Sequence, residues 1–325
     1  MQIQIYRTNS SSYQDSNFFK MEKEELESVP GVKYLKSLTE ANESDPFVLI
    51  SNTHTEPTEL PLTLLDKTVL MIHPNSGHDN FPKTFVENVD FPIIVGNPIR
   101  SNAVAEYTLS SIFHKFTPIK NHSHWSSDRK WDRGLLRDQK VLILGYGEIG
   151  NLIYQSLLPL CSEVQVFDPF VKTSAKNVFN KLSDNLIKDK NIIIVAASLT
   201  KSSRSLIDQN FLKKISSSAT IINAARGEII NEEDLINWMK KNEKSSAYLD
   251  VFNQEPFSPG YMLDMENVNK TSHIAGVYDY LNEDIVKFEK KIVSEFIQSH
   301  SKGEVEKFLD KNKNIVLTGK SINYL

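Results

Sequence analysis

Hydrophobic residues in the first third of the chain form short runs that alternate with polar stretches. Runs of this length between polar spacers are typical of buried strands. We therefore expect a loop at residues 8–16 and strands at 3–6, 47–50, 68–72 and 93–95. From about residue 102 the spacing becomes helical, because apolar side chains recur every three or four residues until shortly before Pro118.

A regular alternation of strands and helices begins near residue 141, after a polar link at 121–137. Helical spacing recurs at 148–157 and 232–241, and a long amphipathic helix is expected at about 279–298. Buried strands are expected at 141–144, 164–167, 192–196, 220–223 and 247–251. This alternation favours a parallel, doubly wound sheet. The residues from 299 onward are polar and show no clear pattern.

Length and composition narrow the class of protein. The 325 residues are enough for two domains, each with its own core. A net charge of −4 gives no reason to expect nucleic acid as a partner. Cys161 is the only cysteine, so we expect no intrachain disulfide and no cysteine-based zinc site. We also expect no other bound metal. The chain shows no signal-peptide pattern and no apolar run of membrane-helix length, so we expect a cytoplasmic protein without membrane contact.

The strand expected at 141–144 runs directly into a glycine-rich sequence, Gly145-Tyr-Gly147-Glu-Ile-Gly150. In such a sequence the first glycine permits a tight turn and the second lets a pyrophosphate approach the backbone. The third glycine lets the following helix pack closely against the strand. Free N–H groups at the start of that helix favour bound phosphate. The sequence thus predicts a dinucleotide site at this turn.

Asp168 ends the next expected strand, 18 residues after Gly150 (168 − 150). A carboxylate at this place can bind the ribose hydroxyls and repels a 2′-phosphate, which favours NAD over NADP as the cofactor. Two other interpretations of the motif stay open. The glycines could merely turn the chain while Asp168 caps a strand, or the motif could belong to a Rossmann-type methyltransferase, which also combines a glycine loop with an acid.

Reactive side chains follow three later strands, at the strand ends where ligands bind in open α/β sheets. Arg226 can clamp a carboxylate and polarise the neighbouring carbonyl. His273 can take the hydroxyl proton as a hydride leaves, or return it in the reverse reaction. Glu255 can orient the imidazole and favour its protonated form. A methyltransferase would leave these three residues unexplained.

These segments resemble the D-isomer-specific 2-hydroxyacid dehydrogenase family. The resemblance spans about residues 76–276, and the order of arginine, glutamate and histidine is also the family's. The matching stretches are 101–106, 145–150, 223–227, 249–256 and 273–276, with a weaker match at 76–79. Two departures stand out. Ser198 occupies a position where the family usually has proline, and the first seventy residues match poorly.

The resemblance implies an NAD-dependent oxidoreductase that moves a hydride between nicotinamide and a 2-hydroxy acid / 2-keto acid pair. Its catalytic residues would be Arg226, Glu255 and His273. The motif and the resemblance together give as cofactor-binding residues Gly145, Gly147, Glu148, Ile149, Gly150, Asp168, Ala197, Ser198, Ala224, Ala225, Asp250 and Gly276. Among these, Asp250 would bind the nicotinamide carboxamide. The substrate-binding residues would be Asn52, Ser76, Gly77, His78 and Arg226.

The family fold implies two α/β domains with doubly wound parallel sheets. A Rossmann NAD-binding domain is expected at residues 102–281, and a flavodoxin-like substrate domain is expected from 1–101 together with 282–325. The long helix after Ala105 typically serves dimerisation in the family, so a homodimer is expected.

Two alternatives remain within the family. The chain could be an NAD(H)-sensing regulatory protein, because the family contains co-repressors that keep the fold and the three reactive residues. The substrate could also be phosphorylated, as in the erythronate-4-phosphate branch of the family. The serine at position 272, directly before His273, resembles the sequence of that branch. The sequence leaves the identity of the hydroxy acid and the direction of the reaction open.

Overall fold

The computed structural model describes residues 2–130, 133–172 and 175–317. The chain divides into two compact units, which are treated separately. The first unit comprises the described residues of Met1–Arg100 and Tyr278–Leu325. The second comprises those of Ser101–Val277. The first unit is therefore built from both ends of the chain, whereas the second is continuous in sequence.

A six-stranded sheet forms the centre of the first unit, with the strand order β13-β5-β4-β3-β1-β2. Every pair is parallel except β13 with β5, which is antiparallel. The five parallel strands follow the flavodoxin-like order, so the predicted fold class is confirmed for this unit. The strands are β1 (Ile3–Arg7), β2 (Val32–Leu35), β3 (Phe47–Ile50), β4 (Thr68–His73), β5 (Ile93–Val95) and β13 (Val316–Leu317).

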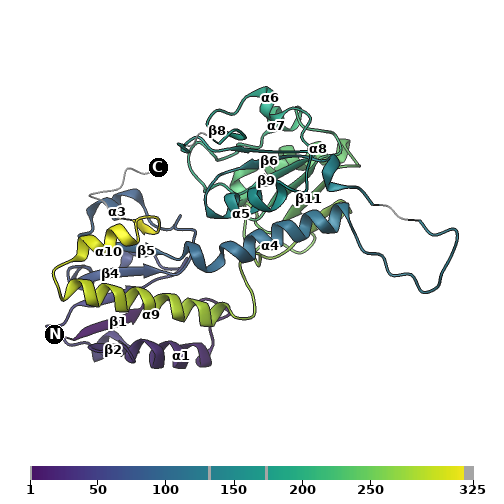
Figure 1. Cartoon of the computed structure of the whole chain (residues 1–325). Helices are drawn as coiled ribbons and strands as arrows, with labels where there is room; N and C mark the ends of the chain where they lie inside the picture. The colour runs from purple at the N-terminus through teal and green to yellow at the C-terminus, as the bar shows by residue number, and fades with distance from the viewer. Residues whose placement is uncertain (1, 131–132, 173–174, 318–325) are drawn as a thin grey trace. The chain divides into compact units, whose positions relative to one another are not determined.

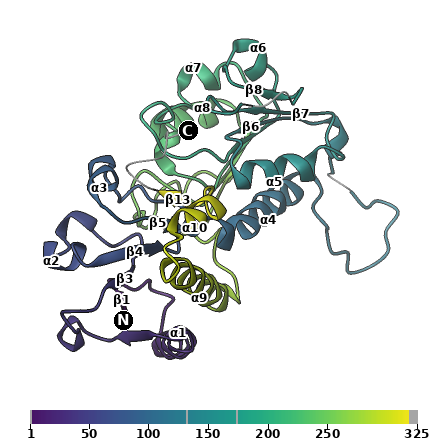
Figure 2. The same ribbon diagram turned by 60° about the vertical axis from the view of Figure 1, so that its left-hand side comes forward.

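Helices cover both faces of this sheet. Alternate strand residues such as Ile5, Ile50 and Ile72 form one core with residues of α1 (Ser16–Glu27), α9 (Leu281–His300) and α10 (Val305–Lys311). The opposite residues, Leu49 and Met71 among them, pack against α2 (Leu62–Leu65) and α3 (Lys83–Asn88). Helices α1 and α9 lie side by side in both views (Figures 1 and 2). Because both faces are covered, the strands are apolar on both sides.

Some elements of the first unit lie where the sequence gave no clear pattern. Helix α1 starts at Ser16, where the side chain of Asp15 accepts hydrogen bonds from the N–H groups of Asn17 and Phe18. Helix α10 and strand β13 lie in the tail beyond residue 299. Both are short, and each is held by one or two buried apolar side chains, such as Phe308 and Val316, rather than by a repeating pattern.

The second unit contains a seven-stranded sheet in the order β12-β11-β10-β9-β6-β7-β8. All described neighbours in it are parallel. The order reverses at β6, as in a Rossmann sheet, which confirms the predicted fold class here too. The strands are β6 (Lys140–Leu144), β7 (Glu163–Phe167), β8 (Val178–Phe179), β9 (Ile192–Val195), β10 (Thr220–Asn223), β11 (Ser246–Leu249) and β12 (Val268–Lys270).

Two layers of helices enclose the seven-stranded sheet. One layer contains α5 (Glu148–Leu157) and the part of α4 (Asn97–Phe116) that belongs to this unit. The other contains α6 (Asp184–Ile187), α7 (Gln209–Leu212) and α8 (Glu232–Lys241). Short 3₁₀ helices occur in the chain at Leu38–Glu40, Pro57–Glu59, Leu136–Asp138 and Gly227–Ile229. Within the described ranges, no helix is both long and apolar enough to span a bilayer.

The apolar face of α4 packs within its own chain. Ala105 and Ile112 are buried in the core beneath the seven-stranded sheet, and Leu109 packs against the same cluster. This face was expected to contact a second subunit because of the family resemblance. The sheet covers part of this face, whereas Phe113 of the same helix stays 42% exposed, so the expected role of α4 in a dimer stays a prediction. After α4 the chain extends away from the sheet in a long segment before β6 (Figure 1).

A buried charge network connects the two ends of the chain in the first unit. Arg7, at the end of β1, donates from Nε to Glu22 of α1 at 2.8 Å and from Nη2 to Glu289 of α9 at 2.6 Å. The hydroxyl of Tyr34 donates to Glu22 at 2.5 Å. Burial raises the pKa of Glu289 well above its ordinary value; Arg7 opposes this rise and the charge of Glu22 adds to it. One guanidinium thus serves two buried acidic side chains inside the fold.

Replacing Arg7 with leucine should destabilise the protein by roughly 3–5 kcal/mol, because it leaves buried carboxyl groups without their cation. The free energy of unfolding in urea measures this loss. Lys23→Ala is the matched control, since Lys23 pairs with Glu27 on the exposed side of α1. The control should cost about 1 kcal/mol or less. Equal losses in the two variants would contradict a structural role for the buried network.

Candidate active site

The glycine-rich turn follows β6 and leads into α5. Gly145 has φ 107°, and a Cβ atom there would lie 2.6 Å from the carbonyl oxygen of Ala196. At Gly150 a Cβ atom would clash with the carbonyl oxygen of Gly145. Both positions therefore require glycine. At Gly147, in contrast, a Cβ atom would meet nothing within 4 Å, so this part of the backbone faces open space.

The first turn of α5 is suited to an anion. Its N-cap is Gly147, which has no side chain to accept hydrogen bonds from the first N–H groups of the helix. Glu148 and Ile149, two expected cofactor-binding residues, occupy this turn. Uncapped N–H groups and the positive end of the helix dipole favour a bound phosphate. The turn thus combines an open backbone approach with unsatisfied donors.

Asp168 follows β7 and lies against the glycine turn. Its Oδ2 accepts a hydrogen bond from the N–H of Tyr146 at 2.8 Å, and its Oδ1 accepts one from Phe170 at 2.9 Å. The carboxylate is therefore fixed beside the loop that would hold a pyrophosphate. Each of its oxygens retains a second lone pair for another donor, such as a ribose hydroxyl.

His273 and Glu255 form a hydrogen-bonded pair in the second unit. Nδ1 of His273 lies 2.7 Å from Oε2 of Glu255. The other carboxylate oxygen of Glu255 accepts the N–H of Phe252 at 2.8 Å. Burial acts to raise the pKa of Glu255, but hydrogen bonds from His273 and Phe252 and the positive charge of Arg226 outweigh it and hold the pKa below its usual value. Glu255 is therefore an ionised acceptor for Nδ1, and Nε2 of His273 is the ring nitrogen that can serve another group.

The loop that carries His273 is held by a buried carboxylate. Asp250, which is 1% exposed, accepts hydrogen bonds from the N–H groups of Ile274 and Ala275, both at 2.8 Å. It also accepts the hydroxyl of Thr271 at 2.6 Å, and its carbonyl accepts the N–H of His273. His273 has φ 55°, a conformation that is unfavourable for a residue with a Cβ atom. These four hydrogen bonds hold it there.

Arg226 lies at the carboxyl end of β10, where the 3₁₀ helix Gly227–Ile229 begins. Its Nη1 donates to the carbonyl of Ala225 at 2.8 Å, and its own carbonyl accepts from Asn223 at 2.9 Å. A Cβ atom at Gly227 would overlap the carbonyl carbon of Phe252, so the two loops pack backbone against backbone. The structure thus brings Arg226, Glu255 and His273 together at neighbouring strand ends of one unit.

The remaining expected cofactor-binding residues also lie after strands of this sheet. Ala197 and Ser198 follow β9, and the carbonyl of Ser198 accepts the hydroxyl of Ser203 at 2.8 Å. The residues that follow β10 and β12 in the same way are Ala224, Ala225 and Gly276. Their role as cofactor contacts stays a prediction, as does the contact of Asp250 with a carboxamide.

The expected substrate residues Asn52, Ser76, Gly77 and His78 belong to the first unit. They lie in the loops after β3 and β4, at the carboxyl edge of the six-stranded sheet. Oδ1 of Asn52 accepts the N–H of His54 at 2.8 Å, whereas its buried Nδ2 has no partner among the described residues. The loop residues 76–78 are half-buried. Both loops therefore present polar groups at an edge where ligands bind in open sheets.

Two polar residues around the reactive pair were not expected from the sequence. The hydroxyl of Tyr107, on α4, lies 2.7 Å from that of Thr271, which in turn donates to Asp250. Tyr107 lies within a helical pattern and Thr271 just before His273, and neither residue belongs to a motif. Only the position of Thr271, two residues from the reactive histidine, could have drawn attention to it.

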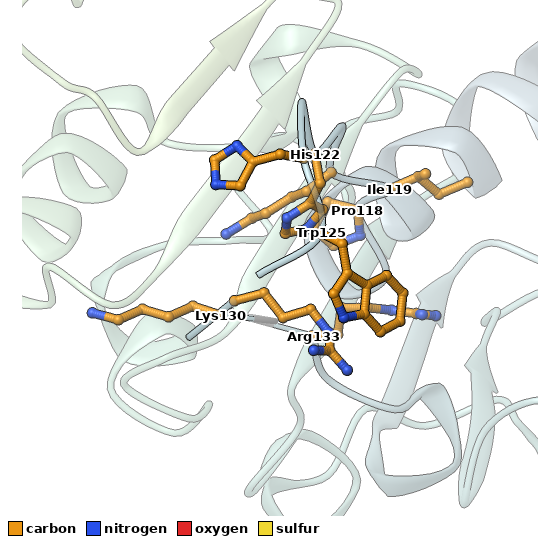
Figure 3. A pocket seen from close by; sticks show the side chains of 9 residues that line it. Pro118, Ile119, His122, Trp125, Lys130 and Arg133 are labelled. Atoms are coloured by element: carbon orange, nitrogen blue, oxygen red, sulfur yellow. The ribbon is translucent and has the colours of Figure 1, made fainter. Parts of the chain in front are cut away.

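A separate hollow lies in the segment that follows α4 (Figure 3). Trp125 is 86% exposed, and the guanidinium of Arg129 stacks over its ring at 4.6 Å. The hollow is lined by Pro118, Ile119, Lys120, His122, His124, Trp125, Arg129, Lys130 and Arg133. None of the expected site residues lines it. Among the described residues, no group of three or more His, Cys, Asp and Glu side chains is arranged to hold a metal ion.

Comparison with known families identifies the second unit. Residues 109–275 match the family described as D-isomer specific 2-hydroxyacid dehydrogenase, NAD binding domain. The chain belongs to this family. The matched segment lies within the continuous unit, so the seven-stranded sheet and its glycine turn form the family's NAD-binding domain. The resemblance found in the sequence is thereby confirmed.

Individual relatives share moderate identity with the chain. It is 27% identical over 226 residues to an erythronate-4-phosphate dehydrogenase of Blochmanniella floridana, covering 68% of this chain and 56% of the relative. It is 30% identical over 207 residues to a D-3-phosphoglycerate dehydrogenase of Archaeoglobus fulgidus, covering 58% of this chain and 39% of the relative. The chain thus spans about half or less of the length of these two relatives.

Solved structures show the same fold. A D-lactate dehydrogenase from Aquifex aeolicus, complexed with NAD and lactic acid, has a TM-score of 0.70 at 19% identity, covering 98% of this chain and all of the other. A 3-phosphoglycerate dehydrogenase from Entamoeba histolytica with bound NAD has a TM-score of 0.68 at 19% identity, covering 92% of this chain and 96% of the other. At this identity the likeness shows the fold alone.

Asp250→Asn should loosen the loop that carries His273. One carboxylate oxygen becomes an NH₂ group that faces an N–H donor, so a hydrogen bond is lost and a buried donor is left unpaired. The free energy of unfolding should fall by about 1–3 kcal/mol. Asp264→Asn is the control, because the side chain of Asp264 is 78% exposed, and it should change stability by about 0.5 kcal/mol or less. A loss no larger than that of the control would show that Asp250 does not hold the loop.

Proposed function

We propose that the protein is an NAD-dependent oxidoreductase that interconverts a 2-hydroxy acid and the corresponding 2-keto acid. The observation that carries this proposal is the 2.7 Å contact between His273 and Glu255, in the same unit as Arg226 and the NAD-binding turn. In this proposal the continuous unit is the NAD-binding domain and the unit built from both chain ends is the substrate domain.

His273 moves the proton in this mechanism. Because Nδ1 is engaged by Glu255, Nε2 takes the hydroxyl proton during oxidation and donates it to the carbonyl oxygen during reduction. Glu255 is an ionised acceptor on Nδ1, so its negative charge lies beside the ring that carries the proton. NAD held at the glycine turn would supply the hydride acceptor for C2 of the hydroxy acid, and NADH would supply the hydride for the reverse reaction.

Arg226 supplies the fixed positive charge for the substrate carboxylate. Its planar guanidinium can hold a carboxylate through two parallel hydrogen bonds and polarise the adjacent carbonyl. The backbone N–H groups of Gly77 and His78, in the substrate domain, are proposed from the family resemblance to contribute to carboxylate binding, with Asn52 and Ser76 as further polar contacts. The acid is thus recognised through its carboxylate and 2-oxygen.

The loops of the substrate domain favour an acid without a phosphate. Residues 8–15, 51–56 and 74–82, which follow β1, β3 and β4, contain neither lysine nor arginine. Arg100 reaches this edge, but it donates to the carbonyl of Pro74 and to the hydroxyl of Tyr13. We therefore expect glyoxylate, pyruvate or hydroxypyruvate to be reduced in preference to phosphorylated acids such as those named for two relatives.

Turnover with NADH and a panel of 2-keto acids tests the proposed function. His273→Ala should lower kcat by roughly 10²–10⁴, the usual contribution of a positioned general acid, while the Kd for NADH stays near that of the wild type.

Glu255→Gln should move the alkaline limb of kcat/KM for reduction to lower pH, because the ionised partner of the imidazole is lost. Near-normal turnover in His273→Ala would contradict the mechanism. NADH binding without turnover of any keto acid would favour an NAD(H)-sensing protein instead.

Asp168 should make NADH the preferred cofactor. Its carboxylate, fixed beside the glycine turn, would repel a 2′-phosphate. Asp168→Ala should reduce the ratio of kcat/KM with NADH to that with NADPH by roughly tenfold, which corresponds to about 1.4 kcal/mol. Asp138→Ala, a change at an acid outside the cofactor motif, is the control and should keep the ratio. Equal efficiency of the wild type with both cofactors would remove the role proposed for Asp168.

The assembly is proposed to be a homodimer. Part of the apolar face of α4 packs within its own chain, so we assign the contact to apolar side chains of α4 and of the following segment that stay exposed. Phe113 is 42%, Ile119 98% and Trp125 86% exposed. Light scattering at micromolar concentration should give twice the mass of one chain. The double variant Ile119→Ser, Trp125→Ser should shift the measured mass toward that of a single chain. A wild-type mass of a single chain would contradict the dimer.

A further inference from the structure

In the loop after β4, the carbonyl oxygens of successive residues each accept a hydrogen bond. Pro74 O accepts from Arg100 at 2.5 Å, and Asn75 O accepts from the N–H of Gly96 at 3.0 Å. Ser76 O lies 3.2 Å from Nδ1 of His78, which can donate to it, and His78 O accepts the N–H of Phe81 at 2.9 Å. The carbonyl of Gly77, between these, is bound by His73.

His73 is the last residue of β4, and it is fully buried beneath this loop. Its Nε2 lies 2.9 Å from the carbonyl oxygen of Gly77, and its Nδ1 lies 3.0 Å from Oγ of Ser51. The ring of Phe81 packs edge-on against the imidazole, with ring centroids 5.0 Å apart. The imidazole therefore has a fixed position and a partner on each nitrogen.

The partners of His73 define its protonation. A carbonyl can only accept, so Nε2 must carry the hydrogen that it donates to Gly77. Burial lowers the pKa of His73 to about 4, against the opposing effect of this hydrogen bond, so the ring is neutral near pH 7. Nδ1 then lacks a hydrogen and accepts the one on the Ser51 hydroxyl. One neutral tautomer satisfies every group.

The hydrogen bond to Gly77 also sets the direction of the next N–H group. In a trans peptide the C=O of one residue and the N–H of the next point in opposite directions. Because His73 holds the Gly77 carbonyl on its own side, the N–H of His78 points away from the buried ring. No acceptor for the N–H groups of Gly77 and His78 is found among the described residues. Engaged carbonyls beside unengaged N–H groups are a backbone arrangement that favours a bound anion.

We propose that His73 is a positioning residue for the substrate carboxylate, which it serves by holding the Gly77 carbonyl so that the His78 N–H is directed outward. This inference rests on the proposed function, in which the N–H groups of residues 77 and 78 bind the acid. It adds a buried side chain that does not touch the substrate itself. Ser51 acts one step further back by fixing the tautomer of His73.

Three variants separate this role from general packing. His73→Phe keeps a ring of similar shape and removes both hydrogen bonds. His73→Gln keeps an NH₂ donor near the position of Nε2 and should restore the hold on Gly77. Ser51→Ala removes only the donor to Nδ1, and it serves as the second test if the phenylalanine variant does not fold. Ile72→Val is the control, because Ile72 is a fully buried neighbour in β4 whose shortening costs stability without touching the loop.

Steady-state reduction of the best keto acid and titration of NADH provide the readout. In His73→Phe the KM for the acid should rise by about ten- to a hundredfold, the range for a lost hydrogen bond to a charged group. The kcat should change little, because the carboxylate is bound alike before and during the reaction. The Kd for NADH should not change. His73→Gln should return KM most of the way to the wild-type value, Ser51→Ala should raise it modestly, and Ile72→Val should leave it unchanged.

A wild-type KM in folded His73→Phe would overturn the inference, as would a glutamine variant as impaired as the phenylalanine one. A parallel fall in kcat and in NADH affinity would also overturn it, because that pattern indicates general disruption. Absence of turnover in the wild type would contradict the proposed function instead. In that case the Kd for pyruvate in the presence of NADH is measured in place of KM. A Kd that rises most in His73→Phe, modestly in Ser51→Ala and little in His73→Gln supports the role of His73. Equal Kd values in all variants refute it.

Discussion

The carboxylate of Asp250 accepts three hydrogen bonds from the loop after β12, and the geometry of the reactive pair depends on them. They hold His273 in a backbone conformation that few residues with a Cβ atom adopt. In this conformation its imidazole meets Glu255, whose second oxygen is tied to the backbone N–H of Phe252. The side chain proposed to exchange a proton is thus positioned by a carboxylate that remains buried behind it.

Both units use the same physical arrangement at their strand ends. In the second unit, buried strands deliver backbone and side chains to one edge, and a few internal acceptors fix the loops there. In the first unit, the imidazole of His73 and the guanidinium of Arg100 hold the carbonyl groups of the loop after β4. Loops fixed by buried partners can present N–H groups and reactive atoms to a ligand without reorganising, which is what electrostatic catalysis requires.

The sequence predicts the parts of this fold that have strong local signals. Helix α5 and strands β3, β5 and β10 have the predicted bounds, because each is a continuous apolar run or follows the glycine motif. Helix α1 was not predicted, since its buried Glu22 resembles a surface residue and its partner Arg7 comes from a distant strand. The short elements α10 and β13 depend on single side chains that pack only in the folded unit.

For the site, the order of Arg226, Glu255 and His273 after successive strands predicts that they lie close together, and in the structure these residues do meet in one unit. The support behind them could not be predicted. Asp250 is a predicted cofactor residue from the family resemblance, whereas the contact that the structure shows is with the histidine loop. His73 gave no signal, because a histidine at the end of an apolar strand is in most cases only a core residue. Such roles depend on contacts between loops, which local patterns do not encode.

The network of Arg7, Glu22 and Glu289 joins residues that are 282 positions apart in the chain. During synthesis, β1 and α1 leave the ribosome before the second unit does, and the whole second unit follows before α9 is made. The continuous unit can therefore fold early, because domains fold as units in the order of their synthesis. The apolar sheet face that α9 covers stays exposed to water throughout that time, and one buried carboxyl group of the network is still missing. The first unit therefore cannot complete its core until α9 has been made, however early the second unit folds.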